Sequence, residues 1–178
     1  MQTKIYVSPD VNFPGKDEKN KDGSLKYPDK FPGFVPQSGT GRAAGDDVST
    51  PYPFILKKGE KHLVDTGLII KIPRGFCILV LPRSGLACKQ DIIVPNSPGL
   101  IDGDYAGEED YIKVMLRNTG DEDRSFEAGD RLCQFLYIPY MSPSYDQQDS
   151  PDFSGDNSRG GFGDSGIQRK ASGFGRSS

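Results

Sequence analysis

The chain has 178 residues, including 22 glycines and 14 prolines, and it carries 22 Lys and Arg against 25 Asp and Glu. This length is that of one domain, or of one domain with arms, and the frequent turn residues favour many short strands over long helices. The net charge of −3 is nearly balanced, so composition indicates no stable nucleic-acid partner and no attraction of the whole protein to a membrane.

The sequence contains neither an apolar N-terminal segment nor a run of 18 apolar residues, so we expect no signal peptide and no membrane span. Its three cysteines, Cys77, Cys88 and Cys133, are far apart, and its one histidine is His62. This set predicts neither a disulfide framework nor a zinc site. It favours a reducing, cytoplasmic compartment, which would be the host cytoplasm if the protein is viral. Cys77 and Cys133 lie in apolar runs and are expected to be buried, whereas His62 is expected at the surface.

The first predicted element is a strand at residues 3–8 (TKIYVS). Residues 9–41 are polar and show no sustained periodicity, so we interpret them as a long surface loop or insertion. Residues 84–90 (SGLACKQ) are the best candidate for a short helix. Strand patterns recur at close spacing from residue 46 onward, at 47–50, 54–59, 63–73, 75–82, 91–95, 111–118, 124–130 and 131–140.

These elements predict an all-β fold, a barrel or jelly-roll type of closure, over residues 1–140. Residues 75–82 are apolar at both alternations, so this strand is expected to be buried on both faces. In the segment 111–118, Lys113 and Arg117 alternate with apolar residues, which indicates a half-exposed strand. After Tyr140 the composition becomes rich in Ser, Asp, Pro, Gln and Gly, so residues 141–178 are expected to form a flexible arm.

The end of that arm, residues 157–178, carries four basic residues against the single acid Asp164, a net charge of +3. It contains Gly-Phe-Gly twice, at 161–163 and at 173–175. Such a segment has too few apolar side chains to form a core. Its composition is consistent with a solvated tail, and also with a segment that becomes ordered on an anionic ligand.

Three polar inserts at the ends of apolar strands are candidate sites. Residues 82–87 (PRSGLA) can bind phosphate oxygens, although they also make an ordinary turn. Within residues 96–110 (NSPGLIDGDYAGEED), a desolvated Asp102 can act as a base on water and Tyr105 offers a flat ring, although a hairpin turn with solvated acids has the same sequence. The paired acids Asp46 and Asp47 fit either Mg²⁺ held partly through water or a solvated turn. One histidine, with no GxSxG and no GxxxxGK[ST], argues against a Ser-His-Asp hydrolase and excludes a P-loop.

Five segments, taken in order, resemble the five motifs of the trimeric dUTPases (deoxyuridine triphosphate nucleotidohydrolases). They are Ala44–Val48, Pro82–Ala87, Gly99–Gly107, Gly129–Gln134 and Arg159–Gly166. The resemblance implies a distorted jelly-roll-like β-barrel and a homotrimer with active sites at subunit interfaces, each closed by the flexible arm. It also implies a dUTP diphosphatase, which converts dUTP and water to dUMP and pyrophosphate with Mg²⁺.

The same resemblance implies roles for individual residues. Asp102 would orient and activate the water that attacks the α-phosphorus, and Tyr105 would pack on the deoxyribose and exclude a 2′-hydroxyl. Uracil would be framed by the substrate-binding set Asn96, Gly99, Leu100, Ile101 and Lys113. Phosphates and water would be held by Arg83, Ser84, Gly85 and Gln134, with Asp47 near the metal through water. In the arm, Phe162 would stack on the uracil, and the phosphates would be wrapped by Arg159, Gly163, Asp164 and Ser165.

The sequence departs from the family pattern at four places. Asp46 stands where a bulky residue is usual, residues 108–110 lengthen the hairpin, Arg159 is displaced by two positions, and Asp164 replaces a Ser. The alternatives are a dCTP deaminase-like enzyme and a non-catalytic nucleotide-binding or regulatory relative. Met115 stands where the deaminases place their glutamate base. The first Gly-Phe-Gly matches the family's lid motif better than the second, which lacks the paired glycine.

Overall fold

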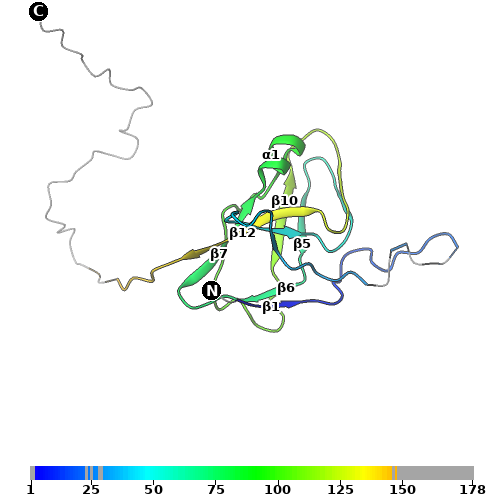
Figure 1. Ribbon diagram of the computed structural model, residues 1–178. Helices are drawn as coiled ribbons and strands as arrows, with labels where there is room; N and C mark the ends of the chain where they lie inside the picture. The colour runs from blue at the N-terminus through cyan, green and yellow to red at the C-terminus, as the bar shows by residue number, and fades with distance from the viewer. Residues whose placement is uncertain (1–2, 23, 25, 28–29, 146, 148–178) are drawn as a thin grey trace, which may run out of the picture. The chain divides into compact units, whose positions relative to one another are not determined.

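The structure of the protein is a computed structural model that describes residues 3–22, 24, 26–27, 30–145 and 147. The chain divides into two units, residues 1–142 and residues 143–178. All helices and strands formed by the described residues lie in the first unit (Figure 1). They are β1 (Lys4–Val7), β2 (Gln37–Ser38), β3 (Asp46–Ser49), β4 (Phe54–Leu56), β5 (Lys61–Asp65), β6 (Leu68–Lys71), β7 (Phe76–Pro82), α1 (Ser84–Gln90), β8 (Ile92–Ile93), β9 (Gly99–Ile101), β10 (Lys113–Asn118), β11 (Arg124–Phe126) and β12 (Arg131–Pro139).

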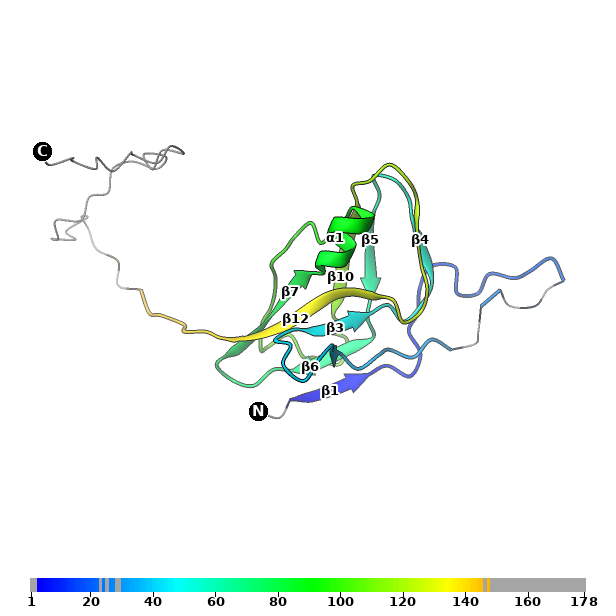
Figure 2. The same cartoon turned by 45° about the horizontal axis from the view of Figure 1, so that its top comes forward.

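The strands form four sheets whose strand pairs are all antiparallel. The largest sheet has the order β2-β3-β12-β7-β9, and the others are β5-β10-β8, β1-β6 and β11-β4. β12 holds the largest sheet together, since it pairs with β7 along its length and with β3 on its other edge, as Figure 2 shows. The expected all-β class and the expected helix at 84–90 are therefore confirmed.

The alternation of buried and exposed residues follows the sequence pattern. In β10, Val114 and Leu116 are buried while Lys113 and Arg117 are exposed, as expected for a half-exposed strand. Adjacent residues Cys77 and Ile78 of β7 are both buried, which confirms burial on its two faces. Cys133 is buried as expected, and Cys88 is exposed.

The apolar segment 63–73 is divided between two sheets at a glycine. Gly67 lies between β5 and β6 with a φ of +67°, and a Cβ at this position would overlap the side chain of Val11. A left-handed backbone without a side chain is the conformation that glycine tolerates best. Gly67 therefore lets the chain turn from one sheet to the next while another segment packs directly against it.

The described residues between 9 and 41 carry little regular structure apart from β2, but they are more than a surface loop. Val11, Phe13 and Phe31 are buried in the main core. The ring of Phe13 stacks on Tyr52 with centroids 4.5 Å apart, and Phe31 meets it edge-on at 4.9 Å. These apolar residues are irregularly spaced, so periodicity could not reveal their burial. The insertion is thus anchored by three side chains.

His62 is less exposed than the sequence predicted. Its ring stacks on Phe54 with centroids 4.6 Å apart, and its buried Nε2 atom has no hydrogen-bond partner. Burial lowers the pKa of His62 below its usual value, with Glu60 opposing that shift. Its neighbour Lys61 is polar, but the β5 alternation turns the histidine toward the aromatic side of the strand.

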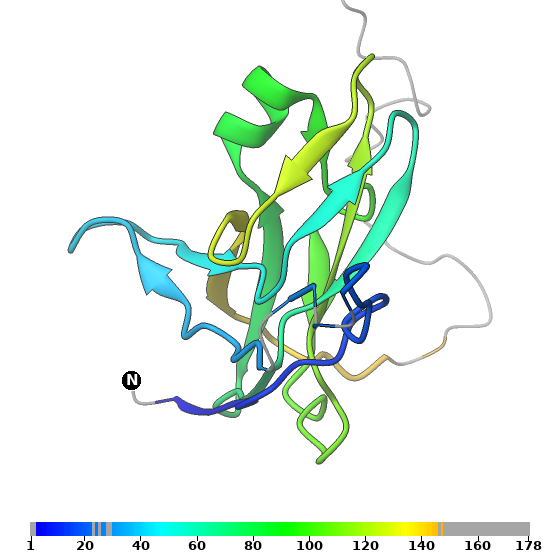
Figure 3. The same ribbon diagram turned by 90° about the vertical axis from the view of Figure 1, so that its right-hand side faces the viewer.

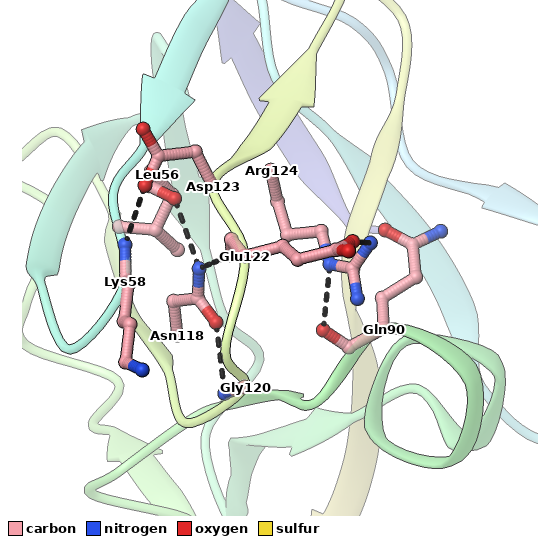
Figure 4. A network of polar contacts seen from close by, with 8 residues as sticks. All are labelled: Leu56, Lys58, Gln90, Asn118, Gly120, Glu122, Asp123 and Arg124. Atoms are coloured by element: carbon pink, nitrogen blue, oxygen red, sulfur yellow. Dashed lines mark hydrogen bonds and ion pairs between the residues drawn. The ribbon is translucent and has the colours of Figure 1, made fainter.

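Buried Asn118, at the end of β10, fixes the turn that leads to β11. Its amide group donates to the carbonyl oxygens of Leu56 (3.0 Å) and Glu122 (2.7 Å), and its Oδ1 accepts from the N–H of Gly120 (2.9 Å). Figure 4 shows these contacts converging on one side chain. A buried amide is stable here because its hydrogen-bonding groups find partners.

The helix α1 follows β7 after one residue and lies at one end of the first unit, with β1 and β6 at the other (Figures 1 and 3). Its last residue, Gln90, accepts a hydrogen bond from Nε of Arg124 at 3.2 Å. The next residue, Asp91, adopts a left-handed conformation with a φ of 57°, which ends the helix. No helix among the described residues is long and apolar enough to span a membrane.

Candidate active site

The segment that connects β9 to β10, called the hairpin below although the two strands pair with different neighbours, lines a cavity of about 500 Å³. Five of its lining residues were predicted from the sequence to form the active site. The other two, Asp104 and Ile112, were not. Its lining consists of Leu100, Ile101, Asp102, Asp104, Tyr105, Ile112 and Lys113. The cavity therefore combines an apolar wall with two carboxylates, an aromatic ring and one amine.

Tyr105 lies on the hairpin and is held by the segment that follows it. Its phenol O–H donates to the carbonyl oxygen of Tyr111 at 3.2 Å. The backbone N–H of Gly107 donates to Oδ2 of Asp110 at 2.7 Å, which closes the tip of the hairpin. Tyr105 is 41% exposed and lines the cavity, so it remains available to a ligand.

Asp102 is solvent-exposed in the isolated chain. The sequence suggested a desolvated carboxylate because Ile101 precedes it, but the alternation of β9 buries Ile101 and leaves its neighbours exposed. Any desolvation of Asp102 must therefore come from a ligand or from another part of the protein that covers the cavity. The exposure of Asp102 could not be predicted from the apolar residues next to it in the sequence.

Asn96 and Gly99 lie at the start of the same hairpin. Gly99 is buried against β7, and a Cβ added to it would lie 3.2 Å from Cβ of Val80 and 3.5 Å from Nδ2 of Asn96. A side chain at position 99 would therefore crowd both the strand and the amide. The glycine keeps the backbone of β9 close to β7 and to Asn96.

A second group of polar side chains surrounds Asp47 on β3. Its Oδ1 accepts from Nε of Arg83 at 2.8 Å, and its Oδ2 accepts from Nη1 of Arg131 at 3.1 Å. Nη1 of Arg83 also donates to the carbonyl oxygen of Arg131 at 3.4 Å. The Asp47 side chain is only 15% exposed, so the two ion pairs are partly desolvated and hold the Arg83 guanidinium in place.

Gln134 belongs to this second group through the strand register. It pairs with Asp47 on β3 and with Leu81 on β7. Its Oε1 lies 2.8 Å from where a Cβ on Gly45 would stand, so glycine at 45 makes room for it. Burial, with the Asp47 charge adding to it, raises the pKa of the neighbouring Cys133 thiol to about 12, so this thiol stays protonated.

Ser84 and Gly85 form the first turn of α1, directly after Arg83. A Cβ added to Gly85 would meet no atom within 4 Å, so the backbone at this point is open to a ligand. Arg159, Phe162, Gly163, Asp164 and Ser165, expected to complete the site, lie outside the described residues.

The donor set does not form a protein cage for a metal ion. Among the described residues, no three His, Cys, Asp or Glu side chains are grouped closely enough to hold one. Both oxygens of Asp47 already accept from guanidinium groups. A carboxylate oxygen can accept more than one hydrogen bond, so Asp47 can still accept from a metal-bound water, and Mg²⁺ usually keeps several waters.

The fold and these two groups define a class of protein: an all-β protein with an apolar cavity that can take a flat ring near the start of β7, and an arginine that can bind phosphate just after the end of the same strand. The sequence matches the dUTPase family over residues 32–166. The chain belongs to the dUTPase family. It is 39% identical over 145 residues to the deoxyuridine 5′-triphosphate nucleotidohydrolase of Rickettsia bellii, covering 80% of this chain and 94% of that one. It is 38% identical over 137 residues to that of Brucella melitensis, covering 75% and 85%.

Solved structures show the same fold. The dUTPase of Streptococcus mutans aligns with a TM-score of 0.59 at 29% identity, covering 62% of this chain and 89% of that one. A mutant dUTPase of Staphylococcus bacteriophage 80alpha, solved with dUpNHpp, aligns with a TM-score of 0.68 at 18% identity, covering 92% and 99%. The expected jelly-roll-like barrel is confirmed.

Proposed function

We propose that this protein hydrolyses dUTP to dUMP and pyrophosphate through attack of water on the α-phosphorus, with Mg²⁺ on the triphosphate. Family membership supports this activity and makes the protein a dUTP diphosphatase. The observation that carries the assignment to residues is the hairpin cavity, which gathers Asp102, Tyr105 and Lys113 with an apolar wall. A flat base, a compact sugar and a reacting phosphate require such a combination.

The apolar wall of the cavity suits the base end of the nucleotide. Leu100, Ile101 and Lys113 line it, and the extended backbone of β9 offers N–H and C=O groups for hydrogen bonds to uracil. Asn96 and Gly99 would complete this end. Tyr105 would pack against the deoxyribose, where its ring would leave no room for a 2′-hydroxyl.

The reacting phosphates of the nucleotide need a general base to activate water and positive charge to stabilise the transition state. Asp102 would orient and activate the attacking water, and Arg83, Ser84, Gly85 and Gln134 would bind phosphate oxygens and water. In phosphoryl transfer, positioning and electrostatic stabilisation supply most of the catalysis. Asp47 would act here in two ways, by holding Arg83 and by meeting the water shell of Mg²⁺.

The remaining parts of the site would come from elsewhere in the assembly. We propose a homotrimer with active sites at subunit interfaces. The arm would close each site, with Phe162 stacked on the uracil and Arg159, Gly163, Asp164 and Ser165 around the phosphates. Such closure would exclude bulk solvent from around Asp102, which the isolated chain leaves exposed, while the attacking water stays bound to its carboxylate.

The test of this function is a substrate panel on the purified full-length protein with Mg²⁺. We expect pyrophosphate release from dUTP, and much less from dCTP, dTTP or UTP. Ammonia release from dCTP would instead identify a deaminase, and Met115 on β10 offers no carboxylate for that chemistry. Binding of dUTP without turnover would identify a non-catalytic relative.

A further inference from the structure

The hairpin that carries Tyr105 has its own internal support, formed by the four residues Glu108–Tyr111. Two side-chain contacts connect this segment to the residues before it: the Tyr105 O–H to the Tyr111 carbonyl oxygen (3.2 Å) and the Asp110 carboxylate to the Gly107 N–H (2.7 Å). Backbone bonds from Asp110 to Gly107 (3.2 Å) and from Tyr111 to Glu109 (2.9 Å) shape the same turn.

This segment is also supported from behind. The ring of Tyr111 lies against Tyr6 of β1, with centroids 6.5 Å apart and planes inclined at 54°. Immediately after it, Ile112 is joined to the barrel by two backbone bonds, from its N–H to Leu68 (2.8 Å) and from the N–H of Thr66 to its carbonyl (3.1 Å). The acceptor for the Tyr105 hydroxyl is therefore attached to two strands of the barrel, β1 and β6.

An exposed tyrosine ring would otherwise have rotational freedom. The Tyr105 side chain is 41% exposed, so packing alone does not fix it, and a single hydrogen bond at its far end restrains the ring where it forms the wall of the cavity. Restraining the ring matters for selectivity, because a wall that can move aside accepts a larger ligand.

We propose that Glu108–Tyr111 is a clamp that positions the Tyr105 ring and thereby sets the size limit at the sugar end of the cavity. This inference rests on the proposed function, since it assumes that the sugar of a nucleotide meets Tyr105. Asp110 and Tyr111 are positioning residues in this account: they act on the ligand through Tyr105. The segment that follows Tyr105 thereby contributes to the discrimination between deoxyribose and ribose.

The test is the ratio of the dissociation constants of UMP and dUMP, measured by calorimetry on the full-length protein without Mg²⁺. Tyr105→Phe keeps the ring and removes the donor to Tyr111. Asp110→Ala removes the acceptor for the Gly107 N–H, and Asp110→Asn is its matched control because an amide oxygen can still accept that bond. Thermal melting of each variant shows whether it is folded.

We expect the preference for dUMP to fall about threefold to tenfold in Tyr105→Phe and in Asp110→Ala, as one hydrogen bond of ordinary strength implies. Asp110→Asn should retain it. An unchanged ratio in both folded variants would overturn the clamp while leaving dUTP hydrolysis intact. A wild-type protein that releases pyrophosphate from dUTP but binds UMP and dUMP equally would also overturn it, whereas absence of turnover would count against the proposed function.

Discussion

At the scale of single residues, Asp102 has the most specific role that we propose, although its surroundings in one chain are those of a surface carboxylate. Asp102→Asn keeps the shape of the side chain and removes the base. We expect turnover of dUTP to fall by about 10²–10⁴-fold, the usual contribution of a positioned base, with binding of dUTP retained. Steady-state kinetics and calorimetry measure the two effects separately.

The matched control for this variant is Asp104→Asn, which removes the same charge from the same cavity. It should retain much more activity than Asp102→Asn. Equal losses in the two variants would mean that the cavity needs negative charge in general, and an active Asp102→Asn variant would refute the assignment of the base.

Asn118 illustrates a residue whose effect is on stability. Asn118→Ala leaves the buried carbonyl oxygen of Leu56, and the partly buried carbonyl oxygen of Glu122 and N–H of Gly120, without their side-chain partner. We expect a loss of about 2–4 kcal/mol in the free energy of unfolding, measured in urea, since each buried unsatisfied group costs about 1–3 kcal/mol. Asn118→Asp keeps the acceptor for Gly120 and loses the donors, so it separates the two contributions. A loss below about 0.5 kcal/mol would contradict this account.

At the scale of elements, the insertion is the segment whose burial differs most from the sequence-based prediction. Phe13 is 7% exposed and stacks on Tyr52, so Phe13→Ala removes its central anchor. We expect a loss of about 3–5 kcal/mol in the free energy of unfolding, as for other buried aromatic residues. Limited proteolysis should also cut the insertion faster.

The control for this variant is Phe34→Ala, in the same region but 38% exposed, which should cost less than about 1 kcal/mol. If Phe13→Ala accelerates proteolysis without lowering the free energy of unfolding, the insertion detaches independently and does not share the core of the barrel.

The elements also show what the sequence could predict. The burial of some strands could be predicted from the alternation of polar and apolar residues. Examples are β10, with one buried and one exposed face, and β7, with two buried faces. The burial of Phe13 and Phe31 was not predictable, because Phe13 stacks on Tyr52, which is distant in sequence, and Phe31 packs in turn on Phe13. The stacking of His62 on Phe54 and the exposure of Asp102 depend on strand pairing and on which face is covered. The Arg83–Asp47 pair needed β3, β12 and β7 to be neighbours.

At the scale of the whole molecule, the arm is expected to take part in catalysis through its first Gly-Phe-Gly. Truncation after Gly166 removes the second copy and keeps the first. We expect dUTP turnover to survive this truncation, because Phe162 would remain available to stack on the base. Loss of turnover would mean that Phe174, in the second copy, closes the site instead. The control is a truncation after Tyr140, which removes both copies and is expected to lose activity.

The insertion leaves the barrel after Ser8 and comes back to the same residue at Gly33. The N–H of Gly33 donates to the carbonyl oxygen of Ser8 at 2.9 Å, and the N–H of Ser8 donates to Gly67 at 2.8 Å. The chain therefore leaves the barrel and returns to it within one hydrogen bond. Lengthening or shortening the stretch between Phe13 and Phe31, which keeps these buried anchors, changes the entropy of closing a loop only slowly, and it moves neither β1 nor β3. Natural variation in length, or an engineered graft, should be accommodated here without disturbing the hairpin cavity.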